Sequence, residues 1–145
     1  MVTTRPATEI DLSFLEEVFL RAKRPHITAT RGFWDEAKEL NQFRPQLELE
    51  YTCLIKLDHV AIGFFMTLER GRDVEPHTIC IAPEYQGRGL GTTIVRRLLS
   101  HAQDQRRGVH LSVLKPNKAA LSLYERLGFV ITGETDHHYQ MSLGS

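Results

Sequence analysis

The feature of this sequence that most constrains its fold is a glycine-rich segment between an apolar run and an amphipathic one. Residues 77–82 (HTICIA) have the apolar, β-branched character of a short buried strand. Residues 90–102 carry apolar side chains three and four positions apart, as on one face of a helix. Gly87, Gly89 and Gly91 lie where the two meet. Because glycine tolerates backbone conformations that other residues avoid, the segment predicts a tight strand-to-helix turn that a ligand can approach closely.

The rest of the pattern predicts strands and helices that pack as one α/β or α+β domain. Asp58-His59 is expected to join two strands as a hairpin, and Pro25 to end the first helix, since proline disfavours a helical conformation in the residue before it. The expected strands are 3–6, 51–57, 59–70, 77–82, 109–114, 128–133 and 137–143, and the expected helices are 10–24, 33–43, 90–108 and 118–127. This order predicts a mixed sheet with helices on both faces.

The composition argues against several classes of protein. The 145 residues suffice to bury a core, and no apolar run approaches the roughly 18 to 20 residues that span a bilayer. The first residues lack the apolar segment of a secretory signal, so we expect a cytoplasmic protein with no membrane partner. Lys and Arg (18) balance Asp and Glu (18), and no nucleic-acid partner is expected. Cys53 and Cys80 are expected to be free, buried thiols, and the seven histidines form no zinc motif, so no metal is expected.

The chemistry around the glycines favours a site for a phosphate-like anion over a bare turn. A P-loop would need Lys and then Ser or Thr after the glycines, and a dinucleotide fingerprint would need GxGxxG with an acidic residue about 20 positions later. This segment has neither pattern. No Asp or Glu lies between Gly87 and Gln103, although a helix start favours acidic side chains, and Arg88, Thr92 and Thr93 occur there instead. Exposed amides, a positive helix end, hydroxyls and an Arg together indicate a phosphate or diphosphate ligand.

Two motifs resemble those of the GNAT superfamily of acyl-CoA-dependent N-acetyltransferases. Residues 86–91 (QGRGLG) match the family signature Gln/Arg-x-x-Gly-x-Gly/Ala. Residues 113–129 (VLKPNKAALSLYERLGF) resemble the second half of the family's cofactor site, with Asn117 and Tyr124 at the family spacing. The resemblance covers nearly the whole chain. It implies that residues 1–145 form a single N-acetyltransferase domain with a mixed, mostly antiparallel central sheet.

The resemblance implies acetyl-CoA as co-substrate, bound in a V-shaped opening between the strands 79–82 and 109–114. The diphosphate would contact the amides of the glycine turn, and the pantetheine arm would pair with strand backbone as an added strand does. Tyr124 would be the general acid that protonates the departing CoA thiolate, although its position also suits a core tyrosine. The cofactor-binding residues that the resemblance implies are Ile79, Cys80, Ile81, Gln86, Gly87, Arg88, Gly89, Leu90, Gly91, Thr92, Asn117 and Tyr124.

The acceptor amine must lose a proton, and the resemblance implies a base at the start of the strand before the glycine turn. An alkyl amine with a pKa near 10.4 is unprotonated in about one molecule in a few thousand at neutral pH. The positions used in family members fall on Glu75 and His77. Strand alternation would put both on the face of Ile79 and Ile81, unless Pro76 ends the ladder between them. A surface ion pair for Glu75 and a backbone contact for His77 are the alternative roles.

By resemblance, the acceptor site lies near the first two helices, in a basic stretch that contains Arg31 and the chain's only tryptophan, Trp34. Arg31 could pair with a substrate carboxylate and Trp34 could wall a pocket, whereas a solvated helix face and a core tryptophan explain them as well. We expect the acceptor to be a primary amine of a small molecule, with a carboxylate-bearing one as an option. The alternatives are a protein or peptide lysine or N-terminus, or a non-catalytic acyl-CoA sensor. A homodimer through the apolar last strand is a further expectation.

Overall fold

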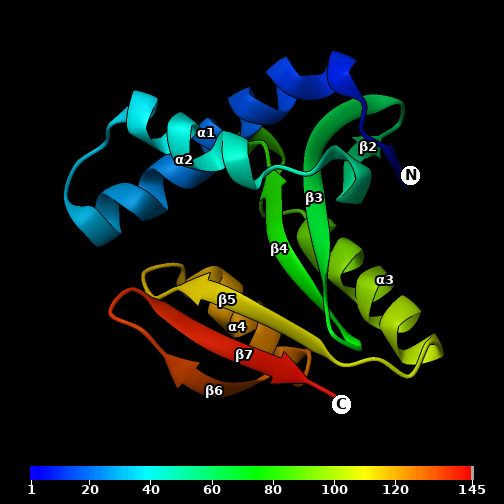
Figure 1. Cartoon of the computed structure of the whole chain (residues 1–145). Helices are drawn as coiled ribbons and strands as arrows, with labels where there is room; N and C mark the ends of the chain where they lie inside the picture. The colour runs from blue at the N-terminus through cyan, green and yellow to red at the C-terminus, as the bar shows by residue number, and fades with distance from the viewer. Residues whose placement is uncertain (145) are drawn as a thin grey trace.

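The computed structural model describes residues 1–144, so Ser145, the last residue of the expected domain, lies outside the described part. Its centre is a seven-stranded sheet in the order β1-β2-β3-β4-β5-β7-β6 (Figure 1). All neighbouring strands are antiparallel except β4 and β5, which are parallel. The strands are β1 (Val2–Pro6), β2 (Thr52–Leu57), β3 (Val60–Arg70), β4 (Asp73–Ile81), β5 (Val109–Leu114), β6 (Val130–Glu134) and β7 (His138–Leu143). The helices are α1 (Leu12–Arg31), α2 (Glu36–Gln46), α3 (Leu90–Asp104) and α4 (Lys118–Arg126), with 3-10 turns η1 (Glu9–Asp11), η2 (Leu49–Tyr51) and η3 (Pro83–Tyr85).

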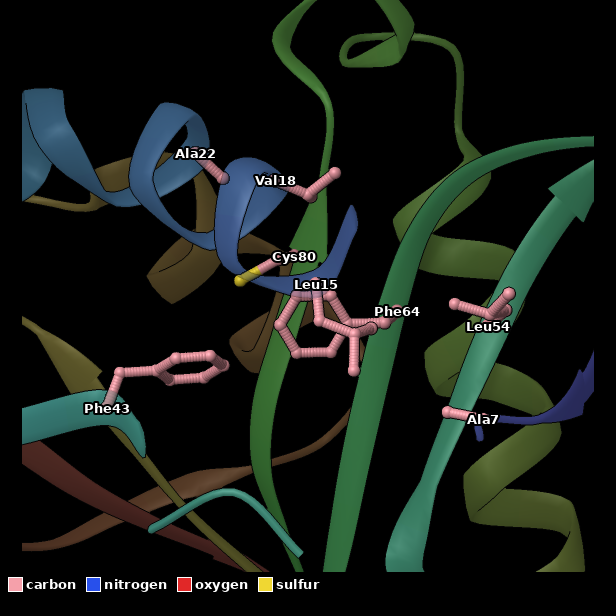
Figure 2. Close-up of a cluster of buried hydrophobic side chains, with 8 residues drawn as sticks. All are labelled: Ala7, Leu15, Val18, Ala22, Phe43, Leu54, Phe64 and Cys80. Atoms are coloured by element: carbon pink, nitrogen blue, oxygen red, sulfur yellow. The ribbon is translucent and has the colours of Figure 1, made fainter. Parts of the chain in front are cut away.

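Helices cover both faces of the sheet. Helix α1 packs Leu15 and Val18 against Phe64 of β3 and Cys80 of β4, and α2 adds Phe43 to the same buried cluster (Figure 2). Helices α3 and α4 cover the opposite face, and their core with β5 and β7 contains Val95, Leu99, Ala102, Val109, Leu111, Val113, Phe129 and Met141. The predicted mixed, mostly antiparallel sheet with helices on both faces is therefore confirmed.

Two local features shape the β2–β3–β4 meander. Asp58 and His59 both have positive φ (48° and 74°), as in a two-residue type I′ turn, so the predicted hairpin is confirmed. Farther along β3, a Cβ atom on Gly63 would lie 2.2 Å from the carbonyl oxygen of Cys80. Only glycine therefore lets β3 approach this part of β4 so closely.

Helix α1 continues through Pro25 to Arg31, so the predicted end at Pro25 was wrong. An interior proline removes one helical hydrogen bond and costs about 3 kcal/mol. Two later features favour continuation. Ile27 lines a large cleft on the inner side of the helix, and Gly32 ends the helix with φ 81° and an N–H donated to the Thr28 carbonyl (2.7 Å). The end signal at Gly32 thus favours a helix that continues to Arg31 despite the local cost of proline.

The other helices differ from the expected ones mainly at their ends. Helix α2 begins at Glu36 rather than near residue 33, because the Asp35 side chain accepts the Lys38 N–H (3.1 Å) as an N-cap. Helix α3 ends at Asp104, before the predicted boundary near Gly108. Within residues 1–144, none of the helices combines the length and apolar character that crossing a membrane requires.

Candidate active site

The central feature of the site is the seam between the parallel strands β4 and β5, which is closed at one end only. The strands pair at Val74 and Val109, where the Val74 N–H donates to the Gly108 carbonyl (3.0 Å). Beyond this point they diverge (Figure 1). A cleft of about 680 Å³ opens between them, within the usual size of small-molecule sites. The V-shaped opening that the resemblance implied is therefore present.

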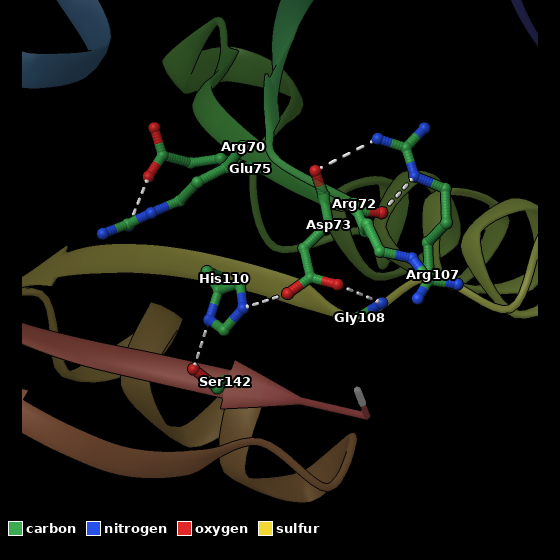
Figure 3. A network of polar contacts seen from close by, with 8 residues as sticks. All are labelled: Arg70, Arg72, Asp73, Glu75, Arg107, Gly108, His110 and Ser142. Atoms are coloured by element: carbon green, nitrogen blue, oxygen red, sulfur yellow. Dashed lines mark hydrogen bonds and ion pairs between the residues drawn. The ribbon is translucent and has the colours of Figure 1, made fainter.

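A polar network holds the closed end of the seam (Figure 3). The Asp73 carboxylate accepts the Gly108 N–H (2.9 Å) and lies 2.7 Å from His110 Nε2, while His110 Nδ1 lies 2.6 Å from Ser142 Oγ on β7. Arg107 donates to the Asp73 carbonyl (3.1 Å). The bond with His110, then that with Gly108, holds the pKa of the Asp73 carboxyl below its usual value. The network joins β4, β5 and β7 at the point where the cleft begins.

The glycine turn forms one wall of the open end. Gln86 donates its side-chain N–H to the Ile81 carbonyl (2.8 Å), which ties the turn to the end of β4. Gly87 and Gly89 both have positive φ (77° and 78°), and Gly89 is the N-cap of α3. The predicted strand-to-helix turn that depends on glycine is therefore confirmed.

The backbone amides of this turn are available to a ligand. The first N–H after Gln86 that donates to a backbone carbonyl is that of Thr93, to Gly89 (3.1 Å). The N–H groups of residues 87–92 have no backbone acceptor within residues 1–144, and the first turn of α3 contains no acidic side chain. Free amides at a positive helix end are an anion-binding arrangement.

The side chains around the turn divide into exposed and structural ones. The Arg88 guanidinium lies over the Tyr85 ring (5.2 Å to the centroid) and donates to the Glu84 carbonyl (3.1 Å), so it stays beside the turn at the surface. The Leu90 side chain is buried in the core, and only its backbone can reach a ligand. Thr92 is half-buried at the same helix start.

Helix α4 and β5 form the opposite wall, where Asn117 and Tyr124 both line the cleft. Asn117 is the N-cap of α4 and accepts the Ala120 N–H (3.2 Å). The Tyr124 ring packs edge-on against Phe129, with centroids 5.5 Å apart. Burial raises the pKa of Tyr124 to about 12. Its hydroxyl, which forms no hydrogen bond to another residue in the 1–144 range, therefore keeps its proton at neutral pH.

Strand β4 presents alternate side chains to the cleft and to the core. Ile79 and Ile81 line the cleft, whereas the Cys80 side chain is fully buried beside Leu15 on the other face. Burial raises the pKa of the Cys80 thiol, which keeps it protonated. Cys80 is not among the residues that line the cleft, and its carbonyl oxygen faces Gly63 of β3, so its predicted contact with the cofactor has no support in the geometry. The buried, protonated thiol is also not available as a nucleophile.

Strand β4 contains a β-bulge at His77. The strand continues back past Pro76 to Asp73, so the proline does not end the ladder. The residues on either side of His77 pair with consecutive residues of β3, which leaves His77 as the extra one. Because a bulge interrupts alternation, Pro76 lies with Ile79 in an apolar pocket against α3. The expected common face of Glu75 and Ile79 was therefore wrong.

Both predicted bases nevertheless line the cleft. The Glu75 carboxylate forms an ion pair with Arg70 (3.0 Å; Figure 3). His77 is exposed, and its Nδ1 lies 3.0 Å from Thr78 Oγ1. That contact orients the imidazole and leaves Nε2 directed elsewhere.

The two residues predicted to bind the acceptor do not line the cleft. Arg31 forms an ion pair with the buried Glu39 (3.0 Å), and Trp34 lies half-buried in the α1–α2 connection with Arg24 over its ring (5.7 Å). The side of the cleft formed by α1 and β7 is lined instead by Phe19, Ala22, Lys23, His26 and Ile27 of α1, Gln46 of α2, Ser112 of β5, and His138 and Gln140 of β7. Lys23 and its α1 neighbours from Ala22 to Ile27 belong to the basic stretch in which the acceptor site was expected, whereas the other residues of this side were not predicted. The α1 residues follow a helical three-and-four spacing that runs through Pro25, a signal that the predicted helix end concealed.

Comparisons with known proteins agree with this geometry. The family model "Acetyltransferase (GNAT) family" matches residues 15–129. The N-alpha-acetyltransferase RimI of Mycobacterium tuberculosis is 44% identical over 72 residues, which cover 48% of this chain and 43% of that protein. An L-methionine sulfoximine/L-methionine sulfone acetyltransferase of Salmonella typhimurium is 27% identical over 145 residues, which cover 92% of this chain and 82% of that protein. The chain spans about half the length of some curated relatives that it matches.

The fold has a close structural counterpart. The PaiA N-acetyltransferase of Thermoplasma acidophilum, whose crystal structure contains coenzyme A, superposes with a TM-score of 0.75. The match covers 100% of this chain and 99% of that one at 20% sequence identity. At this identity the likeness establishes a shared fold.

Proposed function

Because the chain belongs to the GNAT family of acetyltransferases, we propose that it transfers the acetyl group of acetyl-CoA to a primary amine. The observation that carries this proposal is the one-ended β4–β5 seam, whose open end has free amides at the start of α3 on one side and Tyr124 on the other. This arrangement offers an anion site, exposed strand backbone and a protonated hydroxyl around a single cleft.

The residues around the cleft fit the chemical groups of coenzyme A. The six amides of residues 87–92 suit a diphosphate, and no carboxylate in the first turn of α3 would repel it. Cys80 directs its carbonyl toward β3, so the backbone groups of Ile79 and Ile81 face the other side, which is the gap left by the diverging strands, and suit the amides of an extended pantetheine arm. Bound acetyl-CoA would supply the thioester that the acceptor amine attacks. The residues that would hold it are Ile79 and Ile81 through their backbone, Gln86 to Thr92 and Asn117.

In the proposed direct transfer, the chain moves two protons and stabilises one developing charge. A backbone amide near Ile81 polarises the thioester carbonyl. Tyr124 gives its proton to the sulfur as the carbon–sulfur bond breaks, which its raised pKa permits because the hydroxyl is still protonated at neutral pH. His77, directly or through water, receives the amine proton. Glu75 is the second candidate, but its carboxylate is already engaged by Arg70.

A small-molecule amine is the favoured acceptor. The Salmonella relative that matches most of the chain acts on amino-acid derivatives by its name, and the cleft volume suits a compact ligand beside the cofactor. The similarity to RimI, an N-alpha-acetyltransferase, supports a protein or peptide N-terminus as the second candidate, although that match covers only 48% of the chain.

A thiol-release assay against amino acids, polyamines, aminoglycosides and short peptides tests the proposal, with calorimetry of acetyl-CoA binding alongside. We expect binding of acetyl-CoA and thiol release with at least one amine class. Binding without release for every amine would favour the sensor alternative. Absence of binding at millimolar acetyl-CoA by folded protein would exclude the proposed function.

A further inference from the structure

The acceptor side of the cleft contains three basic side chains, one lysine and two histidines, that the proposed acetyl transfer does not use. Lys23 and His26 come from α1, three residues apart and therefore neighbours on one face of the helix. His138 comes from the start of β7, opposite Leu114 at the open end of β5. The three side chains line the same cleft from two elements that are far apart in sequence.

Within residues 1–144, the Lys23 ammonium lines the cleft without a carboxylate partner, unlike Arg21 and Arg44. Arg21 pairs with Glu84, and Arg44 with Glu16. In the part of the chain that the structure describes, no carboxylate lies within ion-pair distance of Lys23. A half-buried ammonium in a cleft gains most from a ligand that supplies the missing negative charge.

The cleft itself offers little to a substrate with several positive charges. Among the residues that line it, Glu75 is the only acidic one, and that carboxylate is paired with Arg70. A polyamine or aminoglycoside would therefore bring further ammonium groups toward Lys23 without a free carboxylate to meet them. A substrate with one amine and one carboxylate would bring no additional ammonium group toward Lys23.

The two histidines add hydrogen-bond donors without adding charge. Burial, and to a smaller extent Lys23, lowers the pKa of His26. Burial, followed by His137, Arg31 and Lys23, lowers the pKa of His138. Both imidazoles are thus neutral near pH 7, so this side of the cleft presents one ammonium and two neutral N–H donors. That set matches one carboxylate.

We propose that Lys23 binds the carboxylate of the acceptor, with His26 and His138 beside it, and that the acceptor is an amino acid or a similar amino carboxylate. This inference rests on the proposed acetyl transfer, since it places the acceptor amine in the same cleft. It replaces Arg31, whose guanidinium is committed to Glu39, as the residue that recognises the acid group.

The test compares L-leucine, L-phenylalanine and L-methionine with the amines that lack only their carboxylate, in the wild type and in Lys23→Gln and Lys23→Arg. We expect the wild type to prefer each amino acid. Lys23→Gln should raise KM for the amino acids by about 10- to 100-fold, the usual worth of a charged hydrogen bond, without changing KM for acetyl-CoA or for the amines. Lys23→Arg should retain most of the preference. Lys38→Gln, an exposed lysine of α2 outside the cleft, is the matched control.

Calorimetric binding of the N-acetylated forms of the same three amino acids gives a readout that needs no turnover. If these compounds bind to the wild type and no longer bind to Lys23→Gln, the inference is supported even when no amine is acetylated. Absence of acetylation would count against the proposed function alone. Acetylation of the amines and amino acids with equal efficiency would overturn the inference and leave the proposed function intact. Failure of all three N-acetyl derivatives to bind folded wild-type protein would also overturn it.

Discussion

The two ends of the β4–β5 seam use the same pair of strands for opposite purposes. At the closed end, Asp73, Gly108 and His110 join the strands through hydrogen bonds (Figure 3). At the open end, Ile79 of β4 and Val113 of β5 belong to different walls of a cleft, and no ladder is formed between the strands. An unpaired strand edge is normally avoided because it attracts other chains. Here the pinned end holds that edge at a distance that an extended ligand can fill.

The comparison also separates two kinds of residue. The polar side chains at the closed end form hydrogen bonds with one another and therefore stabilise the fold. Around the open end, the amides of the α3 turn, the Tyr124 hydroxyl and the Lys23 ammonium have no partner within residues 1–144. Polar groups left without a partner in this way are those available to a ligand.

Of the changes considered, removal of the Tyr124 hydroxyl at the open end should have the largest effect, and this effect should be on catalysis alone. Tyr124→Phe keeps the edge-on packing with Phe129 but removes the proposed acid, so we expect kcat to fall by about 10²- to 10⁴-fold. KM for acetyl-CoA and the melting temperature should stay near wild type. Steady-state thiol release measures kcat and KM, and thermal denaturation measures the melting temperature. An unchanged kcat would remove Tyr124 from the mechanism.

A methyl group added at Gly63 should destabilise the packing of β3 against β4, the strand that takes part in both ends of the seam. Because the new Cβ would lie 2.2 Å from the Cys80 carbonyl oxygen, β3 or β4 must shift, and Gly63→Ala should cost about 3 kcal/mol of unfolding free energy. Gly133→Ala in β6, where the new atom would only meet Gln140 at 3.9 Å, is the matched control. Denaturant unfolding of the two variants should differ clearly; equal midpoints would contradict the predicted clash.

Substitutions at the two candidate bases test whether His77, the extra residue of the β4 bulge, accepts the amine proton at the open end of the seam. His77→Gln should lower kcat by about 10²-fold, the lower limit for a general base. Glu75→Gln should have a smaller effect, because its carboxylate is engaged with Arg70. The reverse order of effects would assign the base to Glu75.

Removing the Asp73 carboxylate from the closed end of the seam should have the smallest effect of the changes considered. The expected effect is a loss of stability that depends on pH. The pKa of Asp73 is lowered in the folded state, chiefly by His110. Its stabilisation is therefore complete above the ordinary Asp pKa of about 3.9 and is lost as the pH falls below that value. Asp73→Asn should lower the melting temperature at pH 7, and this difference should shrink toward pH 3. Asp136→Asn, in an exposed bend, is the matched control for the loss of one carboxylate.

The parts of the site that were predicted correctly depend on short-range rules. The positive φ angles at Gly87 and Gly89, the start of α4 after Asn117 and, outside the site, the hairpin at Asp58-His59 follow from preferences that each residue has in any protein. The α3 turn and α4 could therefore be located before the structure was known. The alternation along β4 could not, because the bulge at His77 arises from pairing with β3.

The sequence by itself determined which segments turn, cap and pair, since glycine torsions, capping hydrogen bonds and apolar periodicity act over a few residues. Only the tertiary structure decided that α1 runs past Pro25 and brings Lys23 and His26 opposite His138. It also decided that Arg31 is paired with Glu39 and lies outside the cleft. The meeting of α1 with β7 and the Arg31–Glu39 ion pair depend on contacts between residues that are separated in the chain, which local preferences do not reveal.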